Sequence, residues 1–490
     1  MNLPTGKLIN YGYKSLLIMT LMLFTMASLS DVIGQPASRP RGPNGLYPRA
    51  PDTIPGTLPE MRDPSYWISK LENPEKVIMT LAQIQTRNSE FFQRMNNFSA
   101  LDSNLRKQIT QELASRPGLI SSKPNLNTLS GEEISSLTTE MIDKEIKFLI
   151  RRKFGNILGN EYSPAEIKSV QDEMAFTAIP KQIKVQTGIS VSDTRLRIVP
   201  ETRFDFVGYN GLAGWDMWNF DIVPIGSHIE ILHVSKSGGS LFVLTEKGLG
   251  WINSQDVALC SADELNKYLN DKNFIICTGD RIPFYSDANC RFVSGWFRMG
   301  DRLPVKSNNA RLVQVPTRMM NGNLLIQEAW LATDADVSKG YLPYTRKNIV
   351  NQVFKLMDNF YDWTGGFYGR DHATQLRDIF AVFGFKLPQM GGMISAYNAN
   401  PKFIYPKEGK EAQYKAILAN DPFTTIQTCS SGHSQLYLGS YKGEPIVFDT
   451  HGYRYNDKNG TELTIRRANI GNMAFPDYFL KQYFSFVELK

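Results

Sequence analysis

Residues 361–383, which read YDWTGGFYGRDHATQLRDIFAVF, constrain the fold of this chain more than any other stretch. The segment begins with aromatic residues and glycines, and its second half has the apolar spacing of one helix face. The apolar positions of that face are Leu376, Ile379, Phe380 and Phe383. Gly384 follows, and glycine is typical of the position just after a helix. The sequence therefore predicts a buried helix that begins at residues 371–374, where free N–H groups and the helix dipole favour an anion.

The same stretch resembles the NlpC-type cell-wall peptidases, which are papain-like cysteine enzymes. Their motif reads Tyr-x-Trp-Gly-Gly and then Asp-Cys-Ser at the start of a helix. The residues that match in spacing are Tyr361, Trp363, Gly365, Arg370 and Asp371. The nucleophilic cysteine of the family falls on His372, and the serine after it falls on Ala373. The resemblance implies a papain-like α+β domain over residues 344–490 with a degenerate nucleophile position.

Two further histidines fit the catalytic pattern of this family. His433 lies in GHSQLYLG, which resembles the family's Gly-His-x-x-Leu-Tyr-Leu-Gly, where the histidine is the general base. His451 follows PIVFDT at the end of the next predicted strand and matches the polar residue that orients the base. The resemblance therefore implies His372, His433 and His451 as the catalytic positions, in the roles of nucleophile, base and orienting group.

A histidine cannot take over the part of a cysteine at position 372. Imidazole is the poorer covalent nucleophile here, and its ring fills the space where the scissile carbonyl has to lie. The helix dipole also disfavours the protonated ring. We therefore expect the architecture of a γ-D-glutamyl-L-diamino-acid endopeptidase that binds peptidoglycan stem peptides, or a protein partner, without cysteine-peptidase activity.

The sequence leaves two other functions open. The first is an active peptidoglycan hydrolase that uses a substitute nucleophile, or a metal held by the three histidines. The candidate substitutes are Cys429, Ser430, Ser431 and Thr374, and Cys429 lacks the helix N-terminus that lowers a thiol pKa. The family geometry places the three histidine rings in a row and not around a point, so neither a metal nor a cofactor is expected. The second is a secreted interaction protein whose partner is not the cell wall.

The resemblance also implies a set of residues that line a binding cleft. Asp371 is expected to pair with the free amino terminus of the substrate. The first barrel of the related enzymes contributes to the cleft, and here it carries the aromatic run GWDMWNFD. A place in the barrel core and domain interface is the alternative for that run. The expected cleft residues are Asp371, Arg370, Tyr361, Trp363, Trp215 and Asp216.

The N-terminal third of the chain predicts helices after a linker. Residues 31–64 are rich in proline and glycine, which is typical of an extended linker or a wrapping arm. Residues 65–180 are expected to form a helical segment. Its predicted helix starts are Asn73 and Ser163, each followed by proline, and a further helix is expected over residues 134–150.

The middle of the chain predicts two small β-barrels. Residues 181–262 and 263–343 contain short runs of alternating apolar and polar residues, broken by Gly, Asn and Asp. Both segments resemble bacterial SH3-like domains, in which a Gly-Trp pair such as Gly250-Trp251 begins a late strand. The expected fold is therefore a multi-domain α+β protein with a helical N-terminal segment, two SH3-like barrels and a C-terminal papain-like domain.

Residues 1–30 have the features of a secretory signal peptide. Lys7 and Lys14 precede the apolar run LLIMTLMLF, and small residues follow it. The run is shorter than the roughly 20 residues that span a bilayer, so we expect no stable membrane span after cleavage. An uncleaved anchor is the alternative for this segment. The mature protein is then expected to be exported, to the periplasm or out of the cell.

Charge and cysteine content restrict the partners further. The net charge is +6 over 490 residues and no long basic run occurs, which argues against nucleic-acid binding. Only four cysteines are present. Cys277 and Cys290 flank a hairpin-like segment, and the sequence leaves open whether they pair or remain buried free thiols.

Overall fold

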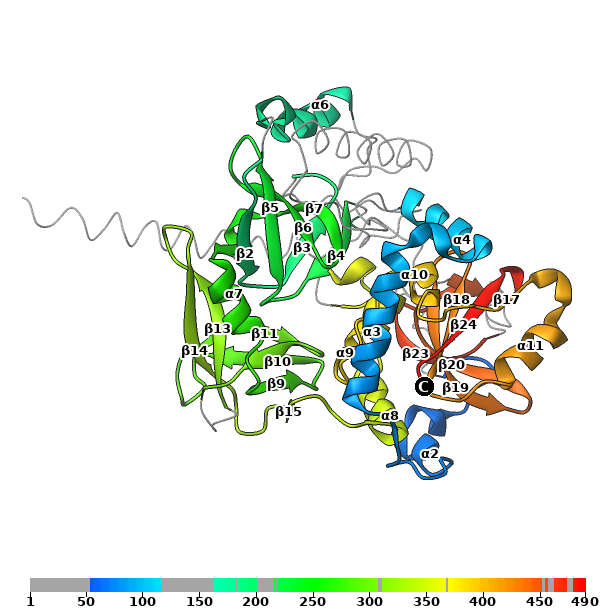
Figure 1. The fold of residues 1–490 in the computed structure, drawn as a ribbon. Coiled ribbons are helices and arrows are strands. Elements are labelled where there is room, and N and C mark those ends of the chain that lie inside the picture. The colour runs from blue at the N-terminus through cyan, green and yellow to red at the C-terminus, as the bar shows by residue number, and fades with distance from the viewer. Residues whose placement is uncertain are drawn as a thin grey trace, which may run out of the picture.

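We describe the protein from a computed structural model. It describes residues 53–115, 163–180, 183–200, 216, 218–306, 311–366, 369–451, 454–456, 462–473 and 479–490. The predicted signal peptide and the helix expected over 134–150 lie outside these residues. Figure 1 shows two β regions on one side, residues 186–259 and 274–339, and a C-terminal α+β region, residues 344–490, on the other. The mixed α+β class expected from the sequence is confirmed.

The C-terminal region is built on a six-stranded antiparallel sheet with the order β17-β24-β18-β19-β20-β23. Its strands are β17 Phe403–Ile404, β18 Thr425–Cys429, β19 Ser434–Tyr441, β20 Glu444–His451, β23 Arg467–Asn472 and β24 Phe484–Glu488. A short hairpin, β21 Arg454–Asn456 and β22 Glu462–Thr464, follows β20. Its helices are α8 Arg346–Lys355, α9 His372–Ala381, α10 Gly391–Ser395 and α11 Lys410–Leu418.

The buried helix predicted from the sequence is α9, and the prediction is confirmed. It packs against β19 and β20, and its apolar face is fully buried in the largest core cluster. The chain leaves the helix at Val382 and turns at Gly384, whose φ of 95° lies in the left-handed region that glycine adopts without strain. The N-terminus of α9 is therefore fixed inside the protein.

The first β region is a seven-stranded antiparallel sheet with the order β4-β3-β7-β6-β5-β2-β8. Its strands are β2 Gln186–Ser190, β3 Thr194–Arg197, β4 Asn219–Val223, β5 His228–Val234, β6 Ser240–Thr245, β7 Gly248–Asn253 and β8 Val257–Leu259. Trp218, Phe220 and Trp251 belong to its buried core. The described part of the run GWDMWNFD therefore matches the core alternative that the sequence left open.

The second β region consists of a four-stranded sheet, β11-β10-β14-β13, and a three-stranded sheet, β12-β9-β15. Helix α7, Ala262–Leu269, connects it to the first region. Its strands are β9 Phe274–Cys277, β10 Arg281–Tyr285, β11 Val293–Arg298, β12 Arg302–Pro304, β13 Leu312–Arg318, β14 Leu324–Trp330 and β15 Val337–Lys339. Short strands from both segments that the sequence assigned to barrels are thus present.

The helix start predicted at Asn73 is wrong. Asn73 lies in a left-handed turn with φ 51°, and the next residues form strand β1, Val77–Met79, which pairs with β16, Tyr344–Thr345. The helix begins only after Thr80, whose hydroxyl accepts the N–H of Gln83 while the Gln83 side chain accepts the N–H of Thr80. This reciprocal capping box decides the start.

The described N-terminal helices are α2 Pro64–Ile68, α3 Leu81–Asn96, α4 Ser103–Ser115 and α6 Pro164–Glu173. The start predicted at Ser163 is confirmed, because Ser163 and Glu166 form a capping box. Figure 1 shows α3 crossing the junction between the β regions and the C-terminal region. Arg94 of α3 donates to the carbonyl of Ala396, and Phe91 stacks on Tyr397 with ring centroids 4.4 Å apart.

Thr80→Ala is expected to destabilise the protein by about 1 kcal/mol, because the substitution removes the side-chain acceptor of the α3 N-cap. Thermal unfolding followed by circular dichroism measures this as a lower Tm. Thr86→Ala is the matched control, since Thr86 is exposed in the interior of the same helix and donates only to the carbonyl of Ala82. An equal loss of Tm in both variants would contradict the capping role.

The described end of the proline-rich segment packs onto the C-terminal region as an arm. Ile54 and Met61 are buried, and the indole N–H of Trp67 donates to the carbonyl of Met61. Arg62 donates to Asn469 at 2.8 Å and pairs with Asp358 at 2.6 Å. The sequence left open whether residues 31–64 form an extended linker or a wrapping arm. Residues 53–64, the part that the structure describes, form an arm.

A buried ion network joins α9 to both β regions. The Asp378 carboxylate accepts from Arg298 of the second β region at 3.0 Å and from Arg370 at 2.8 Å, and its other oxygen lies 3.5 Å from Nε of Arg377. Arg377 pairs with Asp221 of the first β region at 2.5 Å. These contacts fix the position of α9 relative to the two β regions.

Asp378 carries negative charge throughout the neutral range. Burial alone would raise the pKa of Asp378, but the three guanidinium groups outweigh it and lower the pKa to about 2. Arg370 and Arg377 supply the local positive charge from α9 and its start, and Arg298 supplies it from outside the C-terminal region. The carboxylate therefore holds these three cations together.

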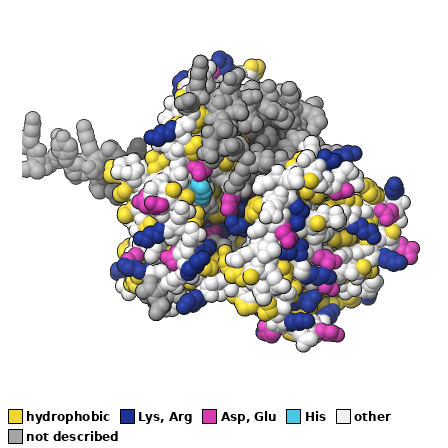
Figure 2. Space-filling model, in the orientation of Figure 1, with side chains coloured by type: hydrophobic (Ala, Val, Ile, Leu, Met, Phe, Trp, Pro, Cys, Tyr) yellow, Lys and Arg dark blue, Asp and Glu magenta, His cyan; other side chains and the backbone are white. Residues whose placement is uncertain are grey.

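All four cysteines are free thiols, so Cys277 and Cys290 are not paired. No helix within the described ranges is long and apolar enough to cross a membrane. Figure 2 shows basic and acidic side chains interspersed over the visible face, in keeping with the small net charge.

Candidate active site

Asp371 caps the first turn of α9 from inside the protein. One carboxylate oxygen accepts the N–H groups of Ala373 at 3.0 Å and Thr374 at 2.8 Å. The other accepts the N–H of Thr364 at 3.1 Å and the side-chain amide of Gln389 at 3.2 Å. Asp371 is 0% exposed, so its carboxylate organises the helix start and the preceding turn. Its predicted pairing with a substrate amine stays a prediction.

His372 is the first residue of α9, and its ring lies against the ring of His433. The two ring centroids are 4.1 Å apart and the ring planes are tilted by 39°. Nδ1 of His372 accepts the backbone N–H of Ser434 at 3.2 Å, so that nitrogen carries a lone pair and the proton of the neutral ring lies on Nε2.

His433 is held by Asp449. Nε2 of His433 lies 2.8 Å from each carboxylate oxygen of Asp449, and both residues are buried. The carboxylate accepts the proton of Nε2, which leaves the lone pair of the ring on Nδ1 and fits the tautomer of a general base. The dyad is thus built as in enzymes in which a carboxylate orients a catalytic histidine.

Asp449 is the candidate site residue that sequence reasoning missed. It lies on β20 two residues before His451. His451 ends β20, as predicted, and the structure pairs it with Arg467, but its side chain lies outside the described part of the chain. Its orienting role stays a prediction. The signal for Asp449 was available: a carboxylate two residues before His451 on the same strand.

Two of the predicted cleft residues, Arg370 and Asp216, are buried and form ion pairs within the protein. Arg370 is 1% exposed, and its guanidinium contacts Asp378 and Asp280. Asp216 is buried and pairs with Arg197 at 2.5 Å. Burial raises the pKa of Asp216, opposed by Arg197. Both residues have partners within the protein. Their contact with a substrate stays a prediction.

Tyr361 and Trp363 are half-buried beside the turn that precedes α9. The indole N–H of Trp363 donates to the carbonyl of Asn219 in the first β region at 3.2 Å. Thr364 follows with φ 56°, a left-handed conformation that is uncommon for a residue other than glycine. Trp215, the last predicted cleft residue, lies outside the described residues.

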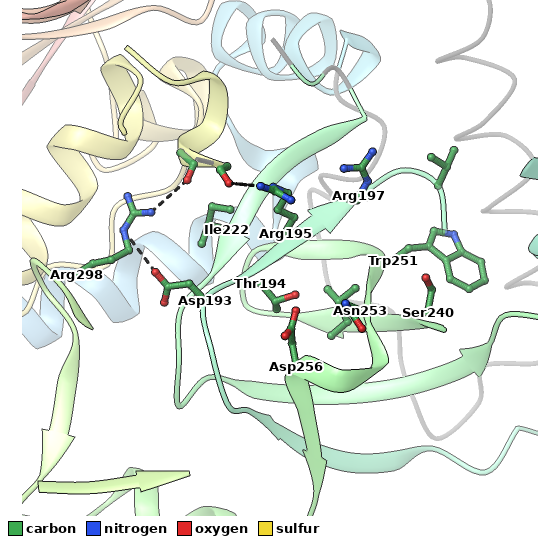
Figure 3. A pocket seen from close by; sticks show the side chains of 14 residues that line it. Asp193, Thr194, Arg195, Arg197, Ile222, Ser240, Trp251, Asn253, Asp256 and Arg298 are labelled. Atoms are coloured by element: carbon green, nitrogen blue, oxygen red, sulfur yellow. Dashed lines mark hydrogen bonds and ion pairs between the residues drawn. The ribbon is translucent and has the colours of Figure 1, made fainter. Parts of the chain in front are cut away.

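A polar cavity of about 210 Å³ lies between the first β region and this turn. Figure 3 shows its lining side chains, including Asp193, Arg195, Arg197 and Arg298. Arg195 donates to the carbonyl of Gly366 at 2.7 Å and 2.9 Å, and Arg298 lies 4.0 Å from Asp193. The arginines therefore link the β regions to the turn that leads to α9.

The substitute nucleophile Cys429 is fully buried. Burial, with Asp449 nearby, raises the pKa of the Cys429 thiol well above its ordinary value, so the thiol stays protonated at neutral pH. Its backbone N–H donates to the carbonyl of His433. Within the described ranges no group of three or more His, Cys, Asp or Glu side chains is arranged to hold a metal ion.

Comparison with known proteins finds a solved structure with the same fold. The sequence matches no protein-family model and no curated protein. Its fold matches an NlpC/P60 endopeptidase from Photobacterium damselae subsp. piscicida with a TM-score of 0.67 and 16% identity, over 90% of this chain and 99% of that chain. The chain has the fold of that NlpC/P60 protein.

Two more distant matches carry the same family name. An NlpC/P60 family protein from Bacillus cereus ATCC 10987 matches 62% of this chain and 100% of its own, with 14% identity and a TM-score of 0.43. NlpC2 from Trichomonas vaginalis matches 62% of this chain and 98% of its own, with 11% identity and a TM-score of 0.25. The match to the Photobacterium damselae protein supports the resemblance drawn from the sequence motifs.

Proposed function

We propose that the protein is an exported, cell-wall-associated relative of γ-D-glutamyl-L-diamino-acid endopeptidases that binds peptidoglycan stem peptides without cysteine-peptidase chemistry. The fold match to an NlpC/P60 endopeptidase over 90% of the chain supports the architecture. The motif residues around Tyr361 and His433 support the peptide class. In this proposal the two β regions are the SH3-like domains of the architecture.

One observation carries the proposal. An imidazole ring occupies the first position of α9 and packs 4.1 Å from the His433 ring, where the family has its thiolate. Nucleophilic catalysis needs an activated group within hydrogen-bond reach of the base. His372 instead uses Nδ1 as an acceptor for a backbone N–H and fills the place beside the base.

A second candidate, an active hydrolase, is favoured by the His433–Asp449 dyad. A histidine oriented by a carboxylate is suited to take a proton from an incoming nucleophile, which includes water. Such a protein would retain a base and replace the covalent step by direct hydrolysis. Cleavage of the tripeptide by the unmodified chain separates this candidate from the binder.

His372→Gly is expected to bind the tripeptide L-Ala-γ-D-Glu-diamino acid about tenfold more tightly than the unmodified chain, without cleaving it. Removing the ring opens the space beside His433 in which the scissile carbonyl has to lie, and a tenfold gain corresponds to about 1.4 kcal/mol. Isothermal titration calorimetry measures the two dissociation constants. Mass spectrometry of the solution recovered from the calorimeter checks that the peptide is intact.

Ala373→Gly is the matched control, because it introduces the same backbone freedom one residue later in the same buried turn. We expect its affinity to stay within twofold of the unmodified chain. Equal affinity of all three proteins would place the peptide away from His372. Absence of binding in every protein at millimolar peptide would remove the stem-peptide role.

A further inference from the structure

A second cavity, of about 570 Å³, lies away from the histidine pair. It is enclosed by α3, by the turn between β6 and β7, and by the end of α9 with the loop after it. Such a volume is typical of small-molecule sites. Its apolar wall consists of Phe91, Phe92, Met95, Ala381, Phe385, Leu387, Pro388 and Met393.

Two basic groups line this cavity with donors that are not used. Lys247, half-buried on the β6–β7 turn, makes no side-chain hydrogen bond or ion pair to any residue that the structure describes. Arg377 is 5% exposed and uses Nη1 toward Asp221 and Gln389 and Nε toward Asp378. Its Nη2 has no partner among the described residues.

The charge of the lining is unbalanced in favour of cations. Three basic side chains face two acidic ones in the cavity. Lys386 pairs with Glu246 at 3.1 Å, and Asp221 pairs with Arg377 at 2.5 Å, so Lys247 has no ion pair of its own among the described residues. Burial, followed by Arg377, lowers the pKa of Lys247 to about 8, and the opposing effect of Asp221, Glu246 and Asp378 does not offset this.

We propose that this cavity binds a small carboxylate with an apolar body. The carboxylate pairs with Lys247 and with Nη2 of Arg377, and the apolar part packs between α3 and the loop after α9. A carboxylate accepts hydrogen bonds from an ammonium and from a guanidinium N–H, and it would give Lys247 an ion-pair partner. The inference does not depend on the function proposed for the histidine site, because none of its lining residues belongs to the His372–His433–Asp449 group.

The test uses phenylacetate and its neutral analogue phenylacetamide as probes of the full chain. Phenylacetate is expected to bind with a dissociation constant of about 1 mM, which is realistic for so small a ligand, and phenylacetamide at least tenfold more weakly. Ligand-observed NMR titration measures both. Equal binding of acid and amide, or no binding of phenylacetate at 10 mM, would overturn the proposal.

Two lysine variants locate the site. Lys247→Met keeps the apolar stem and removes the charge, so phenylacetate affinity is expected to fall at least tenfold. Lys386→Met is the matched control, because Lys386 lines the same cavity but already pairs with Glu246, and its affinity should stay within twofold. Unchanged affinity in Lys247→Met, or equal losses in both variants, would contradict the proposed carboxylate contact. A far-ultraviolet circular dichroism spectrum establishes that each variant is folded, and Lys247→Gln replaces Lys247→Met if it is not.

The pH dependence gives an independent readout in the unmodified chain. Phenylacetate is anionic from pH 6 to 10, whereas the ammonium of Lys247 loses its proton as pH rises through about 8. The affinity should therefore be constant below pH 7 and fall above pH 8. A flat profile over this range would contradict the role of Lys247. The other charged groups that face Lys247 are Asp221, Glu246, Arg377, Asp378 and Lys386.

Discussion

His372→Cys is expected to convert an inert protein into a thiol-dependent peptidase that cleaves the γ-D-Glu–diamino-acid bond of the tripeptide. The new thiol would lie at the N-terminus of α9, where free N–H groups and the helix dipole stabilise a thiolate. It would also lie beside His433, which Asp449 already holds in the tautomer of a base. Release of the free diamino acid, followed by liquid chromatography, measures the gain.

Two controls show whether any gained activity uses the intended groups. Iodoacetamide should abolish it, because alkylation blocks the new thiol. Adding Asp449→Asn to His372→Cys should lower the rate by about a thousandfold or more, since loss of the orienting carboxylate leaves the base in the wrong tautomer. Cleavage that survives either treatment would show that another group does the chemistry. An inert His372→Cys protein would show that the cleft has lost more than its nucleophile.

Asp378→Asn is expected to lower the free energy of unfolding by about 3–5 kcal/mol. The amide keeps the shape of the side chain but removes the one carboxylate that, among the described residues, contacts both Arg298 and Arg370. Arg298 keeps Asp193 and Arg370 keeps Asp280, but losing one partner of a buried charge network is costly. The loss should separate α9 from the second β region. Urea unfolding followed by tryptophan fluorescence measures it.

Asp172→Asn is the matched control for this substitution. Asp172 also pairs with a basic residue, Lys168 at 2.9 Å, but both side chains are more than half exposed. Exposed pairs contribute little, so we expect a change within about 0.5 kcal/mol. If Asp378→Asn were as mild as this control, the buried network would not be what joins the regions.

The same carboxylate predicts the direction of acid sensitivity. The pKa of Asp378 is lowered to about 2 in the folded protein, below the ordinary value of 3.8. Its contribution to stability is therefore complete above about pH 4 and is lost as pH falls toward 2. The difference in unfolding free energy between the unmodified chain and Asp378→Asn should shrink over this interval.

Local patterns in the sequence were sufficient for the elements near the site. The apolar spacing from Leu376 to Phe383 and the following Gly384 predicted α9 correctly, because burial of one helix face is a short-range pattern. The helix start predicted at Ser163 was also correct, because the capping box that sets it joins residues only three positions apart. The helix start predicted at Asn73 was wrong. Its proline-containing pattern competed with a stronger capping box at Thr80, seven residues later.

Long-range contacts were beyond the reach of those patterns. Arg370 was expected in the cleft, yet its charge is used by Asp280, 90 positions earlier, and by Asp378. Asp449 was overlooked because the family motif pointed to His451, two residues later on the same strand. Which of several polar residues pairs with a given partner depends on the packing of distant segments, and no spacing along the chain records that.

The measurement that tests the central claim most directly is prolonged incubation of the unmodified chain with the tripeptide, followed by mass spectrometry. We expect the peptide to stay intact, because His372 occupies the place of the nucleophile next to His433. We also expect the peptide to elute with the protein, because the protein binds it. Release of the free diamino acid by the unmodified chain, lost in His433→Ala, would contradict the account and establish an active hydrolase.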